Sequence, residues 1–134
     1  MSSAGAQSVL AQNKALVLRW FKEVWNEARF ETVAELFAPD GVIHDGPATF
    51  RGPQEFAGFY HGLRAQFSDF SIQPVVTLAE DDLVCVHWSA DFRHTESGKP
   101  LHVSGTSVVR IANGQFVEGW QNWDSAGLEA QLRA

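Results

Sequence analysis

Apolar positions recur three or four residues apart through the first half of the chain. Over residues 8–28 this spacing predicts an amphipathic helix. A second, shorter helix is expected over residues 30–38, because the residue before a proline is pushed out of the helical region. Gly52-Pro53 then precedes a third apolar stripe and predicts a helix start, since proline is tolerated at the first helical position. Residues 1–7 are small and polar, and we expect them to be disordered.

The second half of the chain changes to alternation with period two, which is typical of half-buried strands. Pro74 indicates an edge strand or a bulge, because proline cannot donate to the ladder. Asn113-Gly114 between apolar runs predicts a tight hairpin. The predicted strands cover residues 70–78, 83–93, 101–111 and the segment after the hairpin turn. Helices followed by about four strands indicate an α+β fold with a sheet packed on the helices.

The composition fits one domain over residues 1–134, with ten Phe and five Trp against a single Tyr. So much aromatic surface either fills a bulky core or lines an apolar cavity. The net charge of −6 and the scattered basic residues argue against a nucleic-acid partner. The five histidines show no paired metal-ligand spacing, so we expect no metal site.

Cysteine usage and hydropathy point to a protein of the cytoplasm. Cys85 is the single cysteine and cannot form an internal disulfide, which fits a reducing compartment. The first residues lack the features of a signal peptide. No apolar run approaches the ~20 residues that a membrane-spanning helix needs. We therefore expect a soluble, cytoplasmic protein without a membrane partner.

A series of short motifs covers nearly the whole chain after the first dozen residues. In order they are Trp20-Phe21, Val24-Trp25-Asn26, Phe37-Ala38-Pro39-Asp40, Val42-Ile43-His44-Asp45, Gly52-Pro53, Phe67-Ser68-Asp69-Phe70, Val109-Arg110-Ile111, Glu118-Gly119-Trp120 and Trp123-Asp124. In this order and spacing they resemble the SnoaL-like polyketide cyclases of the nuclear transport factor 2-like superfamily.

The resemblance implies a cone-shaped barrel in which a curved antiparallel sheet wraps around three N-terminal helices. It also implies a deep apolar pocket for a small apolar ligand or substrate, a homodimer formed through the outer face of the sheet, and no cofactor or metal. The chemistry of the cyclases is aldol ring closure, in which an aspartate takes a carbon-bound proton.

Aromatic and aliphatic side chains supply the candidate walls of such a pocket. Alternation places Val86 and Trp88 on one face of their strand, and Gln121 and Trp123 on one face of the last strand. With Phe59 from the third helix, Val86, Trp88 and Trp123 are the predicted substrate-binding residues. The same residues would look no different in sequence if they only filled the core.

Gln121 stands where the resemblance implies the catalytic aspartate of the cyclases. A glutamine amide is no general base at neutral pH, but it can donate a hydrogen bond to an enolate or carbonyl oxygen. We therefore take Gln121 as a candidate catalytic hydrogen-bond donor. The alternative is a polar residue that only bonds a neighbouring strand.

Proton abstraction would then need another group, and His44 is the predicted base because its ordinary pKa lies near ~6.5. The alternative for His44 is a hydrogen bond at the end of a short strand. Asp45 would orient His44 only if both turned the same way, whereas adjacent strand residues point to opposite faces. Asp124 precedes a short closing helix, which it would cap unless a register slip turned it into the pocket.

Two functions stay open at this point. One is a cofactor-free enzyme of the lyase or isomerase class that moves a proton on an apolar carbonyl compound, as an aldol cyclase or isomerase. The other is a non-catalytic domain for small-ligand binding or dimerisation. Epoxide hydrolysis is a weaker alternative, because Trp88, Ala90 and Gln121 occupy the places of the Asp-Arg-Asp group of similar hydrolases.

Overall fold

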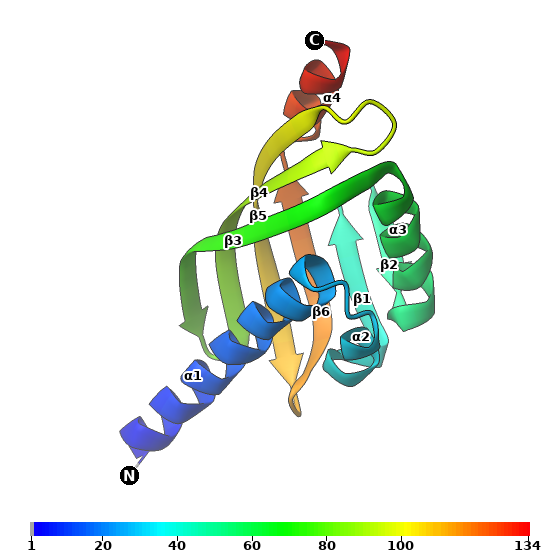
Figure 1. Cartoon of the computed structure of the whole chain (residues 1–134). Helices are drawn as coiled ribbons and strands as arrows, with labels where there is room; N and C mark the ends of the chain where they lie inside the picture. Colours follow the sequence, from blue (N-terminus) through cyan, green and yellow to red (C-terminus); the bar gives the residue numbers. More distant parts are fainter. Residues whose placement is uncertain (1) are drawn as a thin grey trace.

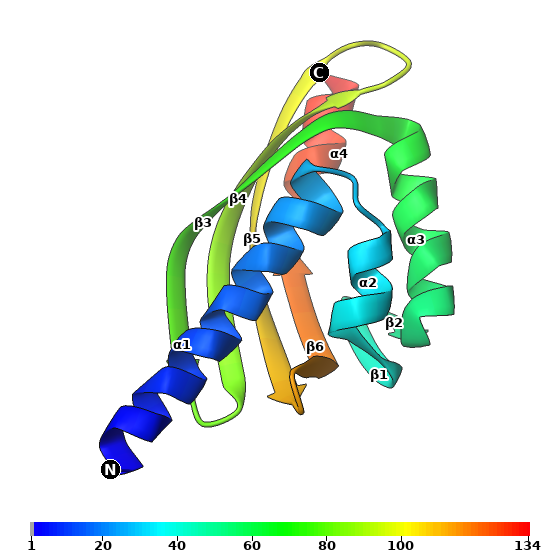
Figure 2. The ribbon, with the colours of Figure 1, turned by 60° about the horizontal axis from the view of Figure 1, so that its bottom comes forward.

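A curved sheet of six strands carries the helices α1, α2 and α3 on one of its faces (Figures 1 and 2). The computed structural model describes residues 2–134, with side chains described from Val9. The elements are α1 (Ser2–Trp20), η1 (Phe21–Asn26), α2 (Glu31–Leu36), β1 (Phe37–Asp45), β2 (Ala48–Arg51), α3 (Gly52–Gln66), β3 (Phe67–Glu80), β4 (Leu83–His94), β5 (Pro100–Ala112), β6 (Gln115–Trp123) and α4 (Ser125–Arg133).

The helix α1 begins earlier than its apolar stripe indicates. Its backbone is helical from Ser2, whereas the pattern predicts a start at residue 8. The side chains of residues 1–8 lie outside the described part of the chain, and the expected disorder of residues 1–7 stays a prediction.

The strand order β2-β1-β6-β5-β4-β3 confirms the predicted α+β fold with a curved sheet on N-terminal helices. Two features of the sheet differ from the prediction. First, the sheet does not close into a barrel, and β2 and β3 are its edge strands. Second, the sheet is not purely antiparallel, because β1 pairs with β6 in parallel. The strand β2 was not predicted, because its residues are mostly exposed and show no apolar alternation.

Local signals in the strands are confirmed where turn chemistry or proline decides the backbone. Pro74 lies in the edge strand β3, and the register against β4 shifts between Pro74 and Val76. Asn113 and Gly114 both have positive φ, 53° and 74°, as a two-residue hairpin between β5 and β6 requires.

The core lies between the helices and the concave face of the sheet. On β4 the predicted inward face is buried, and it carries Val84, Val86, Trp88, Ala90 and Phe92. The helix α1 passes into a π-helical segment, η1, whose Phe21, Val24 and Trp25 are buried.

Side chains of α3 bind the carbonyl oxygens at the end of η1. Tyr60 donates its hydroxyl to the carbonyl of Val24 at 2.7 Å, and Arg64 Nη1 donates to the carbonyl of Trp25 at 2.8 Å. Helix ends leave such carbonyls without intrahelical partners, so these bonds stabilise the segment.

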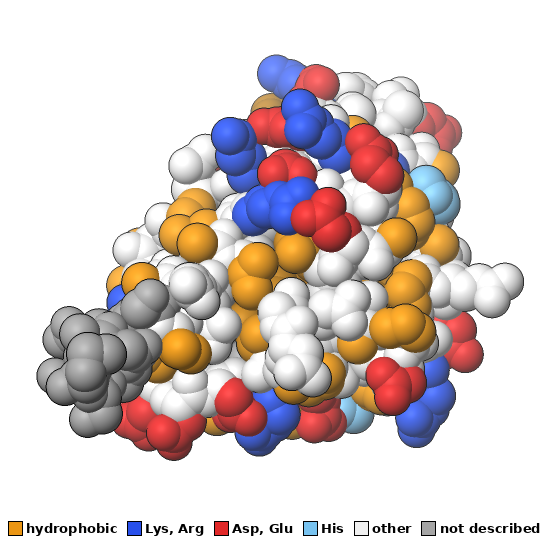
Figure 3. Space-filling view, turned by 90° about the horizontal axis from the view of Figure 1, so that it is seen from below, with side chains coloured by type: hydrophobic (Ala, Val, Ile, Leu, Met, Phe, Trp, Pro, Cys, Tyr) orange, Lys and Arg blue, Asp and Glu red, His pale blue; other side chains and the backbone are white. Residues whose placement is uncertain are grey.

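Acidic and basic side chains lie next to one another on the face drawn in Figure 3. Among the described residues, Arg19 forms ion pairs with both Glu23 and Glu35. Among the described helices, none is both long and apolar enough to cross a membrane.

Candidate active site

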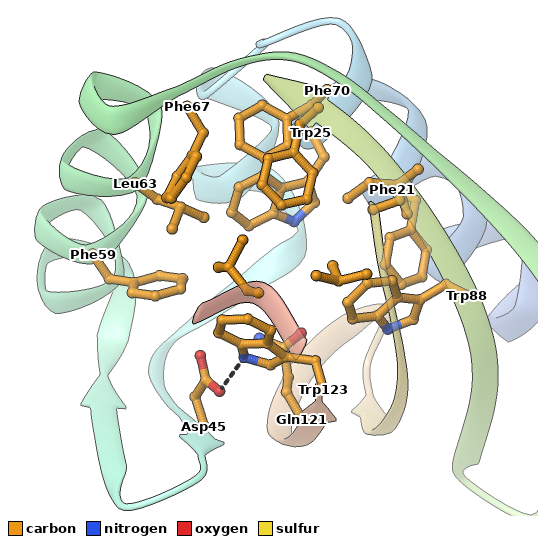
Figure 4. A pocket seen from close by; sticks show the side chains of 15 residues that line it. Phe21, Trp25, Asp45, Phe59, Leu63, Phe67, Phe70, Trp88, Gln121 and Trp123 are labelled. Carbon is orange, nitrogen blue, oxygen red and sulfur yellow. Dashed lines mark hydrogen bonds between the residues drawn. The ribbon is translucent and has the colours of Figure 1, made fainter. Parts of the chain in front are cut away.

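A partly open cavity of about 80 Å³ lies between η1, α3, α4 and the concave face of the sheet. One water molecule needs about 10–15 Å³ on this measure, so the cavity has room for about five to eight groups of that size. The lining residues are Phe21, Trp25, Asp45, Phe59, Leu63, Phe67, Phe70, Ile72, Trp88, Ala90, Phe92, Val103, Gln121, Trp123 and Leu128 (Figure 4). Only Asp45 and Gln121 of these described residues are polar.

These two polar residues are direct neighbours in the sheet. Asp45 on β1 is the register partner of Gln121 on β6, and Gln121 is the register partner of Ser107 on β5. Paired residues of adjacent strands share a face about 4.8 Å apart. Asp45, Gln121 and Ser107 therefore form a row of polar side chains across three adjacent strands, the polar row.

Asp45 ends β1 with its carboxylate at the cavity. Trp123 Nε1 donates to Asp45 Oδ1 at 3.1 Å, as Figure 4 shows, and Oδ2 has no hydrogen-bond partner among the described residues. Burial raises the pKa of Asp45 above its ordinary value of 3.8, and the bond from Trp123 opposes part of that rise. A carboxylate with a raised pKa is a stronger base than an exposed one.

Gln121 lies beside that carboxylate with its amide oxygen already bonded. Ser107 Oγ donates to Gln121 Oε1 at 3.3 Å. Its Nε2 has no partner among the described residues, although the side chain lines the cavity. The amide can therefore donate to a ligand, while the neighbouring carboxylate can accept a proton.

The structure brings four of the residues predicted from sequence to this cavity: Phe59, Trp88, Gln121 and Trp123. Val86 is completely buried in the core and does not line the cavity. The parts that these residues play in binding or catalysis stay predictions.

His44 lies on the opposite face of the sheet, so the expectation that it reaches the pocket is wrong. Its Nε2 donates to Glu118 Oε2 at 2.8 Å, and its ring stacks on Trp120 with 5.8 Å between centroids. The alternation along β1 turns His44 outward and Asp45 inward. Asp45 consequently does not orient His44.

Asp45 is the site residue that sequence reasoning missed as a candidate base. The alternation of His44 and Asp45 was visible in the sequence, and it required that one of them face inward. Which one does so depends on the pairing of β1 with β6, whose partner residues lie 76 positions further along the chain, as Asp45 and Gln121 do.

Asp124 caps α4 and does not line the cavity. The backbone N–H of Gly127 donates to Asp124 Oδ1 at 2.9 Å, which confirms the capping prediction. Within the part of the chain that the structure describes, no group of three or more His, Cys, Asp or Glu residues is arranged to hold a metal ion.

One family model and many solved structures match this chain. The SnoaL-like domain model matches residues 17–119. IdmH from Streptomyces antibioticus, a proposed polyketide cyclase, is 25% identical with a TM-score of 0.79, and the match covers 90% of this chain and 99% of that chain. A proposed polyketide cyclase from Acidithiobacillus ferrooxidans is 26% identical with a TM-score of 0.82, and the match covers 91% and 94% of the two chains.

A proposed SnoaL-like polyketide cyclase from Jannaschia has a TM-score of 0.85 at 20% identity, with 92% of this chain and 93% of that chain covered, and so shares the fold. The search of curated proteins gives no match.

Proposed function

The chain belongs to the SnoaL-like domain family, and from this premise we propose that it is a cofactor-free enzyme of the cyclase or isomerase type. Its reaction would begin with removal of a proton from the carbon next to the carbonyl group of a small apolar compound. The observation that carries the proposal is the pairing of Asp45 with Gln121 on the floor of an otherwise apolar cavity.

Asp45 is the base in this proposal. The C–H proton passes to its free oxygen, Oδ2, and the electron pair of that C–H bond moves into the carbonyl group to form an enolate. The apolar surroundings that raise the pKa of Asp45 make the carboxylate a better proton acceptor. The aspartic acid then returns the proton to the product.

Gln121 supplies the hydrogen bond to the enolate oxygen. Negative charge grows on that oxygen as the proton leaves, so a donor held beside it lowers the barrier. The spacing of adjacent strands suits a substrate whose acidic carbon is bonded directly to the carbonyl carbon. Attack of the enolate on a second carbonyl would close a ring, and reprotonation at another carbon would isomerise the compound.

The charges of the cavity favour an uncharged substrate. No Lys, Arg or His is among the described residues that line it, so an anionic group would meet Asp45 without compensation. The walls formed by Trp88, Trp123 and Phe59 favour a flat, apolar molecule. The volume limits the enclosed part of that molecule to a small ring system.

A binding domain without chemistry is the second candidate, because Gln121 replaces the aspartate that the resemblance implies for the cyclases. Epoxide hydrolysis has less support, since Trp88, Ala90 and Gln121 line the cavity without a carboxylate or guanidinium group among them. We also propose a cytoplasmic homodimer, formed through the outer face of the sheet where His44 and Trp120 lie.

Deuterium exchange tests the proton-transfer step without knowledge of the natural product. Cyclohexanone, 2-cyclohexenone and 2-tetralone would be incubated with the protein in D₂O, and NMR would follow deuterium incorporation next to the carbonyl. We expect Asp45→Asn to lower the enzymatic exchange rate by roughly 10²-fold or more. The matched control is His44→Asn, the neighbouring position on the other face, which should leave the rate unchanged.

Equal exchange by the wild type and Asp45→Asn would remove Asp45 from the mechanism. Binding of these ketones without any exchange above the buffer rate, seen in ligand-observed NMR, would favour the binding domain instead.

A further inference from the structure

We propose that Ser107 is a positioning residue that, together with Trp88, fixes the amide group of Gln121 with its NH₂ toward the cavity. The effect on rate rests on the proposed function, whereas the orientation of the amide does not. Ser107 would act only through Gln121, because it does not line the cavity that Asp45 and Gln121 share.

Ser107 is unusual for its burial. It lies on the concave face of β5 and is only 4% exposed, and Thr32 is the only other buried polar residue among those the structure describes. Its register partner on β6 is Gln121. A hydroxyl group enclosed among apolar side chains is unfavourable unless its hydrogen bonds are made, so its partners define its role.

The indole of Trp88 sets the direction of the hydrogen bonds. Trp88 Nε1 lies 3.0 Å from Ser107 Oγ, and an indole N–H can only donate. Ser107 Oγ therefore accepts from Trp88 and uses its single proton to donate to Gln121 Oε1, 3.3 Å away. With the amide oxygen bound in this way, the NH₂ group of Gln121 points away from Ser107.

The reversed amide is disfavoured on two grounds. If Gln121 Nε2 faced Ser107, the buried hydroxyl proton would lose its acceptor, and unsatisfied buried donors are costly. The amide oxygen would then lie beside the carboxylate of Asp45, so two acceptors would meet the substrate oxygen and no donor. The bond from Trp88 through Ser107 removes this ambiguity, which glutamine side chains otherwise have.

The space around Gln121 explains why such an anchor is needed. A second cavity of about 40 Å³ lies on its other side, and both Ser107 and Gln121 line it. Without the bond from Ser107, the Gln121 side chain would have room to turn away from the substrate. The hydrogen bond from Ser107 therefore keeps the NH₂ group of Gln121 in place before the substrate binds, as a preorganised site requires.

The kinetic test uses Ser107→Ala, with exchange of 2-tetralone in D₂O as the assay. We expect kcat to fall about 10- to 100-fold, less than the 10²- to 10³-fold typical for removal of the donor itself, with KM nearly unchanged. Ser107→Thr, which keeps the hydroxyl, should restore most of the rate. Thr106→Val removes a hydroxyl from the neighbouring position on the other face, near His87, and should have no effect.

A double mutant tests whether Ser107 acts through Gln121. In a Gln121→Leu background, Ser107→Ala should cause no further loss, because the group that it positions is gone. A full additional loss in that background would overturn the proposal. If Ser107→Ala does not fold, Ser107→Cys takes its place, since it keeps the volume but donates poorly.

Side-chain NMR signals test the orientation independently of activity. In Ser107→Ala we expect the Trp88 indole N–H signal to shift and the Gln121 NH₂ signals to broaden or merge. Unchanged signals would overturn the proposal whatever the rate does. If these signals change but Asp45→Asn exchanges 2-tetralone as fast as the wild type, the proposed function fails and the positioning of Gln121 stands.

Discussion

Replacement of Asp45 by asparagine should stabilise the protein at neutral pH even though it removes the proposed base. The carboxylate lies half-buried among the mostly aromatic and aliphatic side chains that line the cavity, and burial raises its pKa in the folded protein. At neutral pH the folded state must therefore keep a charge in surroundings that disfavour it. Asparagine has nearly the same shape, carries no charge, and its amide oxygen can still accept the hydrogen bond from Trp123.

The sign of the effect follows from proton binding. Between the ordinary pKa of 3.8 and the raised folded pKa, the folded state binds more protons than the unfolded state, so the stability of the wild type falls as the pH rises. Above the folded pKa the whole destabilisation is present. Asparagine does not titrate, so the advantage of Asp45→Asn should grow across this window and stay constant above it.

The magnitude is modest because the side chain is only half-buried. Each unit of pKa shift corresponds to about 1.36 kcal/mol, and solvent screens part of that for a group with this exposure. We expect the free energy of unfolding of Asp45→Asn to exceed that of the wild type by up to about 1 kcal/mol at pH 7. For a domain of this size, this corresponds to a rise of up to about 4 °C in Tm.

Thermal unfolding of both proteins at pH 7 and at pH 3 measures this difference. The Tm advantage of Asp45→Asn should be present at pH 7 and absent at pH 3, where the aspartate is protonated in both states. If Asp45→Asn were instead less stable than the wild type at pH 7, and this deficit were smaller at pH 3, the carboxylate would stabilise the fold. The reasoning on desolvation would then be refuted.

Two further substitutions test the packing of Trp88 in the cavity wall and the capping of α4. Gly105→Ala should lower the free energy of unfolding by about 1–3 kcal/mol, because a Cβ at this position would lie 2.5 Å from Trp88 Cζ2 and force this ring to move. An unchanged midpoint in urea unfolding would contradict this account of the packing around Trp88. Asp124→Ala should cost about 1 kcal/mol through loss of the cap on Gly127. It should not change deuterium exchange next to the ketone carbonyl, and a loss of that rate would mean that Asp124 reaches the cavity after all.

Sequence patterns predicted the parts of the fold that depend on neighbours along the chain. The inward face of β4, the hairpin at Asn113-Gly114 and the cap by Asp124 each follow from alternation, turn geometry or capping within a few residues. The strand β2 was not predicted, because it has no such local pattern. It is short and exposed, and it is defined by its pairing with β1 rather than by its own pattern.

The candidate site could be predicted only in part, because it depends on pairing between distant strands. Alternation on β4 and β6 predicted which side chains share a face of each strand, and Trp88, Gln121 and Trp123 do line the cavity. On β1, alternation stated only that His44 and Asp45 face opposite ways. A shift of one residue in the pairing of β1 with β6 would have exchanged their positions, and no local signal sets that register.

This dependence on register also explains why the polar row is a sensitive feature of the molecule. Asp45 and Gln121 come together through the parallel pairing of β1 with β6, and Gln121 and Ser107 through the antiparallel pairing of β6 with β5. Each polar group on this apolar face is unfavourable alone and useful only beside its partner. A slip in either pairing would place a carboxylate or an amide against an aromatic wall, so the register that aligns the proposed base with its donor is also the register that the core requires.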